Sequence, residues 1–161
     1  MTVIGKFRQE DLSVYFFIKD LLGSKVRRVV DSYPYTNIED NTLEVPCVSV
    51  EHSVTFDNGG ELGSSWFRRT WSIDVFASTD TQRDELSDII FQALDNSIPI
   101  RDYSSGFKED GKGLAGVDLR IIEWAGVEDR SMRPTYAFPS LSNKKFWRTT
   151  ITFSTVTTQA T

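Results

Sequence analysis

The stretch Trp71-Ser72-Ile73-Asp74-Val75-Phe76-Ala77, followed by Ser78-Thr79-Asp80-Thr81 and then by residues 82–96, decides the fold of this chain. Its first part alternates apolar and polar residues, which predicts a half-buried strand. Thr79 with Gln82 three positions later matches a capping box, in which two side chains bond free N–H groups at a helix start. The stretch therefore predicts a strand, a tight polar turn and an amphipathic helix that packs on a sheet. The helix has an apolar stripe of Leu86, Ile89, Ile90, Ala93 and Leu94, and a water-facing side of Asp84, Asp88, Gln92 and Asp95.

A long β-hairpin is predicted before this helix. Its first strand covers residues 45–56, and Asp57-Asn58-Gly59-Gly60 is a turn signal because Asn and Gly accept positive φ angles. The returning strand covers residues 61–77, so we expect an exposed tip between two long strands. The alternation places on one face of the first strand Val48, Val50, His52, Val54 and Phe56, and on one face of the second strand Phe67, Trp71, Ile73, Val75 and Ala77.

Residues 9–23 predict a first helix with an unusually wide apolar arc. Its apolar residues are Leu12, Val14, Tyr15, Phe16, Phe17, Ile18, Leu21 and Leu22. The clear polar stripe is reduced to Gln9, Ser13 and Asp20, with Lys19 at its margin. A surface helix needs an apolar arc of only about 100°. Two interpretations follow: a central helix inside the monomer, or a helix that packs on its own sheet and against a neighbouring subunit.

The remaining chain predicts short strands joined by loops. We expect a strand at 25–31, a loop at 32–42, an extended piece at 98–103, and a glycine-rich, flexible, exposed loop at 104–116. A strand at 119–127 contains adjacent Ile121 and Ile122, which indicates a β-bulge or burial of both faces. A long loop at 128–143, a strand at 144–156 and a frayed tail at 157–161 complete the chain. The predicted class is α+β: a single domain, residues 1–161, with a largely antiparallel, possibly mixed, β-sheet packed by two main α-helices.

Composition points to an ordinary soluble globular chain. It has 161 residues, of which 39% are hydrophobic and 25% charged, and its net charge is −5. This acidic balance disfavours a protein that grips nucleic acid. The single cysteine, Cys47, rules out an internal disulfide and favours a reducing compartment. We expect neither a signal peptide nor a membrane-spanning helix, because no apolar segment is long enough.

Motifs for chemistry are weak throughout. Residues 106–112 match the GxxxxGK half of a phosphate-binding loop, but Gly113 follows where a Ser or Thr is needed, and a strand pattern follows where a helix is needed. The only histidine, His52, and Cys47 fall on opposite faces of one predicted strand, so they do not form a nucleophilic pair. We therefore expect no catalytic residues, no metal site and no cofactor, and we predict that the chain is not an enzyme.

Four arginines lie beside aromatic residues: Arg68, Arg69, Arg130 and Arg133. Such combinations occur on faces that bind single-stranded nucleic acid, and they are equally enriched in protein–protein interfaces. The net negative charge and the acidic neighbours Glu128 and Asp129 favour the second interpretation.

The order of elements resembles the tail terminator, or tail-completion, proteins of long-tailed bacteriophages with non-contractile tails. The resemblance covers most of the chain as an order of elements. Its residue-level likeness lies between Trp66 and Tyr103, including Trp71-Ser72-Ile73-Asp74-Val75-Phe76-Ala77 and Ile98-Pro99-Ile100. The loops at 104–116 and 128–143 have no counterpart in it.

The resemblance implies a structural protein of the virion that forms a ring, a hexamer in this family, on the head-proximal end of the tail tube. The ring stops tube polymerisation and joins the tail to the head. The implied partners are other copies of the chain, the tail tube protein and the head-completion or connector protein. Genomic DNA passes through the lumen without specific binding, and no membrane is involved. The alternatives are another phage neck or tail-tube protein, and a nucleic-acid-binding α+β module.

Interface residues follow from these interpretations. We expect side chains of the first helix to cover a neighbour, namely Tyr15, Phe17 and Leu21. We expect the hairpin tip and the long loop to bind partner proteins, which makes Asn58, Gly59 and Tyr136 candidate interface residues. The four arginines above should pair with acidic groups across subunits.

Overall fold

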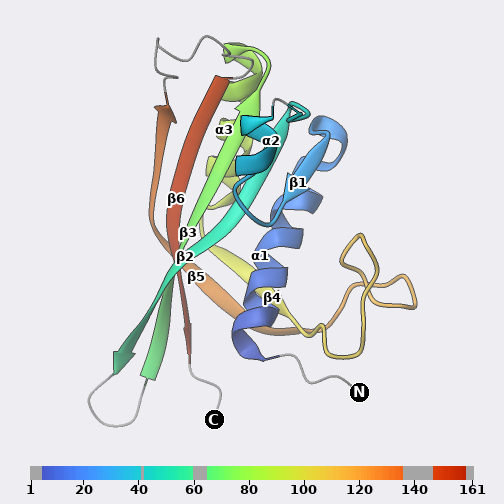
Figure 1. Ribbon diagram of the computed structural model, residues 1–161. Helices are drawn as coiled ribbons and strands as arrows, with labels where there is room; N and C mark the ends of the chain where they lie inside the picture. The colour runs from blue at the N-terminus through green and yellow to red at the C-terminus, as the bar shows by residue number, and fades with distance from the viewer. Residues whose placement is uncertain (1–4, 41, 60–64, 136–146, 159–161) are drawn as a thin grey trace.

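The chain folds around one six-stranded, strongly curled sheet in the computed structural model, which describes residues 5–40, 42–59, 65–135 and 147–158 (Figure 1). The helices are α1 (Lys6–Leu22), α2 (Tyr35–Glu39) and α3 (Asp80–Ala93), with a 3-10 turn at Gly23–Lys25. The strands are β1 (Arg28–Val30), β2 (Cys47–Gly59), β3 (Ser65–Ala77), β4 (Ser97–Arg101), β5 (Ile121–Thr135) and β6 (Trp147–Thr158).

The strand order is β1-β2-β3-β6-β5-β4. β1 runs parallel to β2, and every other neighbouring pair is antiparallel. The long hairpin of β2 and β3 is present, with Asn58 opposite Trp66 and Gly59 opposite Ser65. The predicted class, an α+β fold with a mixed and mainly antiparallel sheet, is confirmed.

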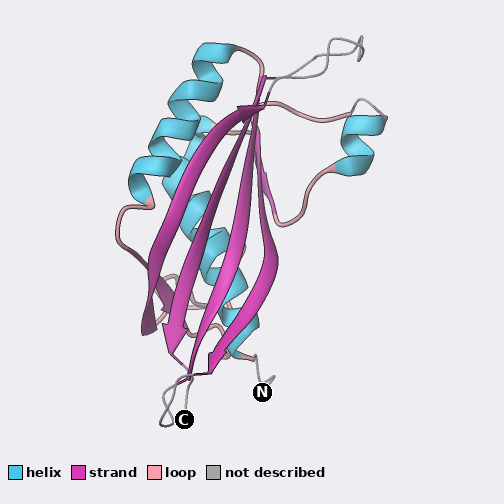
Figure 2. Cartoon of the chain, turned by 90° about the vertical axis from the view of Figure 1, so that its left-hand side faces the viewer, coloured by secondary structure: helices cyan, strands magenta, loops and turns pink. Residues whose placement is uncertain are grey.

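The two long helices pack on the same face of the sheet (Figure 2). Residues from α1, from α3 and from alternate positions of β2, β3 and β6 form one apolar cluster. At its centre Trp71 stacks on Phe153, with ring centroids 6.4 Å apart. The largest fully buried members include Ile18, Leu22, Trp71, Ile73, Ile90, Leu94, Ile98, Ile151 and Phe153.

The capped helix α3 agrees closely with the prediction. Thr79 Oγ1 accepts the Gln82 N–H at 3.1 Å, and Gln82 Oε1 accepts the Ser78 N–H at 3.0 Å. The Gln82 side chain therefore bonds the N–H of Ser78, one residue before the N-cap Thr79. Leu86, Ile90 and Leu94 are buried, Ile89 and Ala93 are half-buried, and Asp84, Asp88, Gln92 and Asp95 are exposed.

The face assignment of β2 was wrong beyond His52. A register shift inserts Ser53, so that His52 lies opposite Trp71 while Val54 lies opposite Thr70. Since side chains alternate between faces, this bulge moves Val54 to the face without helices, where it is 44% exposed. The side chain of Phe56 lies outside the described residues.

The strand β5 is longer than predicted. The bulge at Ile122 is confirmed, because Ile100 pairs with Glu123 and Arg101 with Ile121. The alternative, burial of both faces, is wrong because Ile122 is 42% exposed. Residues 128–135, expected as loop, continue the strand, and residues 136–143 lie outside the described part.

Three smaller expectations need correction. The predicted loop at 32–42 contains the short helix α2, and the predicted strand at 25–31 is reduced to three residues by the preceding 3-10 turn. The tail does not fray at Thr157, which is 2% exposed within β6. Residues 159–161 lie outside the described part.

Candidate interaction surfaces

The wide apolar arc of α1 is covered by the same chain. Gln9 and Ser13, expected to face water, are buried against β4 and the segment that follows it. Ser13 Oγ accepts the Arg101 N–H at 2.9 Å, and Gln9 Oε1 accepts the Tyr103 N–H at 2.7 Å. These two polar side chains satisfy backbone donors at one edge of the sheet, which is why they can be buried.

Part of the loop at 104–116, around Phe107 and Gly111, packs over the outer side of α1, whereas Leu114 is 67% exposed, as expected for an exposed loop. Phe16 stacks on Tyr103 and meets Phe107 edge-on, both at 5.8 Å between ring centroids. Gly111 has φ +81°, and a Cβ there would lie 2.6 Å from Phe16 Cγ. Lys19 Nζ donates to the Glu109 carbonyl at 3.0 Å. This packing favours the first interpretation of α1, a helix enclosed largely within the monomer.

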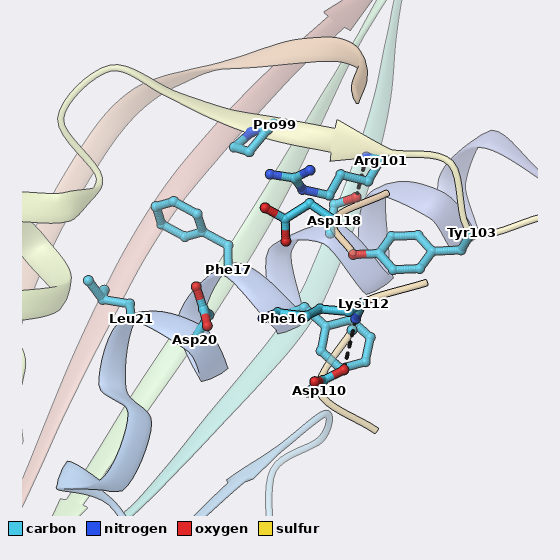
Figure 3. A pocket seen from close by; sticks show the side chains of 12 residues that line it. Phe16, Phe17, Asp20, Leu21, Pro99, Arg101, Tyr103, Asp110, Lys112 and Asp118 are labelled. Atoms are coloured by element: carbon cyan, nitrogen blue, oxygen red, sulfur yellow. Dashed lines mark hydrogen bonds between the residues drawn. The ribbon is translucent and has the colours of Figure 1, made fainter. Parts of the chain in front are cut away.

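The three helix residues expected at an interface are each partly engaged. Tyr15 donates its hydroxyl to the Val29 carbonyl at 2.9 Å. Phe17 and Leu21 are half-buried against the core and line a cavity of about 400 Å³ between α1, β4 and the loop (Figure 3). Only their outer surfaces remain available to a neighbour.

The same cavity holds side chains of both charges. Asp20, Asp110 and Asp118 line it together with Arg101 and Lys112 (Figure 3). Arg101 Nη1 already donates to the Leu119 carbonyl at 2.6 Å. Mixed charge around a half-open hollow does not select one class of ligand.

Arg69 is buried in the core, so its side chain does not reach the surface of the monomer. Its side chain is 2% exposed and lies on the helix-packed face of β3. It donates to Asp11 Oδ1 at 2.7 Å and to the Phe7 carbonyl at 3.1 Å, and it lies 3.4 Å from Glu10 Oε2. The guanidinium also lies over the rings of Phe7 and Trp71. The expectation that Arg69 is available for pairing across subunits is therefore wrong.

Glu10 completes this buried polar network. Its Oε1 accepts the Thr155 hydroxyl at 2.6 Å, and Thr155 Oγ1 accepts the Trp71 indole N–H at 2.9 Å. Burial raises the pKa of Glu10, while the Thr155 hydrogen bond and the Arg69 charge oppose that rise. The network ties the first turns of α1 to β3 and β6.

Two of the other arginines also have partners in the same chain. Arg68 forms ion pairs of 2.6 Å with both Glu128 and Asp129. Arg130 donates to the Phe91 carbonyl at 2.6 Å and lies 3.7 Å from Asp95. Arg133 is exposed on β5. Of the four arginines, Arg133 is therefore the best placed to reach another molecule.

Asn58 and Gly59, expected in the hairpin turn, are instead the last two residues of β2 and pair with Trp66 and Ser65. Tyr136 and residues 60–64 lie outside the described part.

His52 and Cys47 lie on opposite faces of β2, as the alternation predicts, since Cys47 pairs with Phe76 and His52 with Trp71. His52 Nε2 shares a hydrogen bond of 2.8 Å with Thr55 Oγ1. Burial, and then the nearby charge of Arg69, hold the pKa of His52 below its ordinary value. Burial raises the pKa of the Cys47 thiol. These features describe a packed histidine and an unreactive cysteine.

The sheet face away from α1 and α3 is not among the predicted interaction sites, although the alternation of apolar and hydroxyl residues in β6 indicates one polar face. That face carries hydroxyl side chains on neighbouring strands: Thr70, Ser72, Ser131, Thr150, Thr152 and Ser154. Its charged residues include two internally paired arginines, Arg68 and Arg148, the latter 2.8 Å from Asp74. One end of this face is covered, because Tyr33 packs on Phe76 and on Arg148 and buries Phe76. The rest is polar and locally charge-balanced, with exposed Trp66 at the other end of β3.

Within the described ranges, no group of three or more His, Cys, Asp or Glu residues is placed to hold a metal ion. None of the described helices is long and apolar enough to cross a membrane. No protein-family model matches the chain, and no curated protein matches its sequence.

Proposed function

We propose that this chain is a structural protein of a bacteriophage virion, a tail terminator of a long, non-contractile tail. In this proposal the chain forms a ring, a hexamer in the virion, at the head-proximal end of the tail tube. The ring stops tube polymerisation and provides the surface that joins the head. Its partners are further copies of itself, the tail tube protein and a head-completion or connector protein.

One observation carries the proposal: the two long helices occupy a single face of the sheet (Figure 2), and the opposite face carries mostly polar side chains on β3 and β6. Antiparallel sheets commonly leave one face to water. Here that face belongs to a chain whose order of elements, from an N-terminal helix through a hairpin to a capped helix, resembles that of tail terminators. A sheet backed by its own helices is a rigid unit that can present one face and its loops to other subunits.

Charge supports a lumen through which DNA passes without binding. The net charge is −5, and the arginines Arg68 and Arg148 on the open face are paired with carboxylates of the same chain. A nucleic-acid-binding face instead needs unpaired cations that displace counterions from phosphates.

The test is a mass measurement on the pure protein, alone and mixed with tail tube protein, combined with electron microscopy of the mixture. We expect rings, or monomers that become rings on tube ends, and tubes that stop growing once capped. A strict monomer that never caps tubes would refute the proposal. Filaments without a length limit would indicate a tube protein, and single-stranded DNA binding that weakens steeply with salt would indicate the nucleic-acid-binding alternative.

A further inference from the structure

The strand β2 has a long unpaired edge. β1 covers only Cys47–Ser49, because its three residues pair with those three positions. No strand in the described part of the chain lies along the outer side of residues 50–59. Unpaired N–H and C=O groups along such an edge are a template for another strand.

The strand β5 has a second unpaired edge on the opposite side of the sheet. β4 pairs with residues 121–126 of β5. Beyond them, residues 128–135 pair with β6 on one side and with none of the described strands on the other. Ser131, Met132, Arg133 and Pro134 are all exposed, so both faces of this edge meet solvent.

The two edge strands run in opposite directions. Successive antiparallel pairings from β2 through β3 and β6 make β5 run opposite to β2. Two copies in the same orientation can therefore place β5 of one beside β2 of the other as an antiparallel pair. β1 covers only the start of β2, and β4 covers β5 only up to Gly126, after which the Val127 N–H donates to the Asn96 carbonyl. The open segments, residues 50–59 and 128–135, are therefore of similar length.

We propose that the free edge of β2 in one copy pairs with the free edge of β5 in the next copy, so that one sheet continues from subunit to subunit. This inference rests on the proposed ring and names the contact that builds it. The contact is heterologous, since the two edges differ, and repeating it generates a closed ring or a filament. The bulges at Ser53 and after Glu128, together with Pro134, restrict the registers that can form.

Side chains favour a register with Glu51 opposite Arg133. Glu51 pairs with Ser72, and Arg133 with Thr150, which places both charges on the face without helices. Opposite charges facing each other across two strands stabilise the pair, and like charges destabilise it. In the same register Met132 faces His52, on the helix-packed side of both strands.

A cavity is present where Met132 would enter. It measures about 550 Å³ and lies between α1 and the β2 edge. Its lining combines apolar residues such as Leu12, Val50 and Trp71 with the charged residues Arg8, Asp11, Arg28 and Asp31. Met132 is 42% exposed in the monomer. A flexible thioether side chain suits an irregular, partly apolar hollow of this kind.

The experiment is disulfide trapping with Glu51→Cys and Arg133→Cys under mild oxidation. Directly opposed positions in antiparallel strands have Cβ atoms close enough for a disulfide. The chain with both substitutions should give a ladder of covalent oligomers. An equal mixture of the two single variants should give dimers only, and each single variant alone should give none. The wild-type chain, whose only cysteine is the buried Cys47, is the control.

A charge exchange provides a second readout without cysteine. Glu51→Arg alone and Arg133→Glu alone should each weaken self-association by roughly fivefold or more, because a facing pair of opposite charges becomes a like pair. Combining both substitutions in one chain should restore it. Restoration distinguishes contact between the two residues from a general loss of folding.

Three results would separate the possible failures. If the wild-type protein forms rings but neither this cysteine pair nor Glu51→Cys combined with Ser131→Cys gives a ladder, the edge contact is refuted and the ring proposal stands. If Glu51→Cys alone forms dimers, β2 pairs with its own copy and the heterologous contact is refuted. If the wild-type protein stays monomeric even on tail tubes, the proposed function itself fails.

Discussion

Replacing Arg69 by Met should destabilise the fold by about 3–5 kcal/mol, the cost of breaking a buried ion pair by removing one partner. The side chain of Arg69 is 2% exposed, and that of Glu10 is 1% exposed. In the variant, Glu10 keeps its hydrogen bond from Thr155 but loses the guanidinium 3.4 Å away. Asp11 is 33% exposed on its side chain and can be hydrated instead. Most of the destabilisation therefore comes from the buried charge of Glu10, which is left without its partner.

Urea unfolding at pH 7, followed by circular dichroism, measures this change. Arg68→Met is the matched control, because the adjacent Arg68 pairs with carboxylates that are 46% and 73% exposed, and such pairs contribute about 0–1 kcal/mol. Adding Glu10→Leu to Arg69→Met should recover much of the loss, since the uncompensated charge is then absent. A cost below about 1 kcal/mol for Arg69→Met, or one equal to that of Arg68→Met, would refute this account of the core.

Three further perturbations test other parts of the fold. Gly111→Ala should destabilise the fold by about 1–3 kcal/mol in thermal unfolding, because φ is +81° and the new Cβ would meet the Phe16 ring. Gly126→Ala is the control, since a Cβ there has open space and the substitution should be nearly neutral. Equal effects of the two substitutions would contradict the packing of the loop on Phe16. Thr79→Ala should cost about 1 kcal/mol through loss of the helix cap, and an unchanged urea midpoint would argue against that cap. Burial raises the pKa of Glu10 in the folded state, so the stability that protonated Glu10 contributes is fully present below the pKa of the unfolded chain and is lost as pH rises through the folded-state pKa. Glu10→Gln should therefore flatten the decline of the urea midpoint with rising pH. An unchanged slope would refute the raised pKa of Glu10.

The sequence predicts well where local signals and burial agree. The helix α3 carries its cap, its apolar stripe and its polar face within one short segment. The hairpin is predicted by its two alternating runs, although Asp57, Asn58 and Gly59, expected in the turn, extend strand β2. The bulge at Ile122 was visible as two adjacent isoleucines. These features depend on neighbours in the chain, so they can be predicted without knowing the sheet.

The predictions that were wrong concern residues whose environment is set by partners distant in the sequence. Gln9 and Ser13 have the pattern of water-facing residues, but they bond backbone groups of Arg101 and Tyr103, about 90 positions away. Arg69 interrupts the apolar side of β3 because its carboxylate partners lie in α1. Ser53 shifts the register of β2 with no local signal.

The extension of β5 was missed for a related reason. Residues 128–135 are charged and include Pro134, which is typical of a loop. An edge strand tolerates both features, because one side of its backbone needs no partner strand. Pairing with β6 on one side keeps this segment extended, and its position at the sheet edge explains why the other side needs no partner.

The central position of β6 has a consequence for the order of folding during synthesis. β6 lies between β3 and β5, so residues 147–158 join the half of the sheet built from β1–β3 to the half built from β4 and β5. The hydrogen bond from Thr155 to Glu10 spans 145 positions. Long-range pairings of this kind form late and slowly, since the intervening chain must first be brought together. A nascent chain that has not yet released β6 therefore has two unjoined half-sheets, and the complete six-stranded sheet forms only when this strand is inserted.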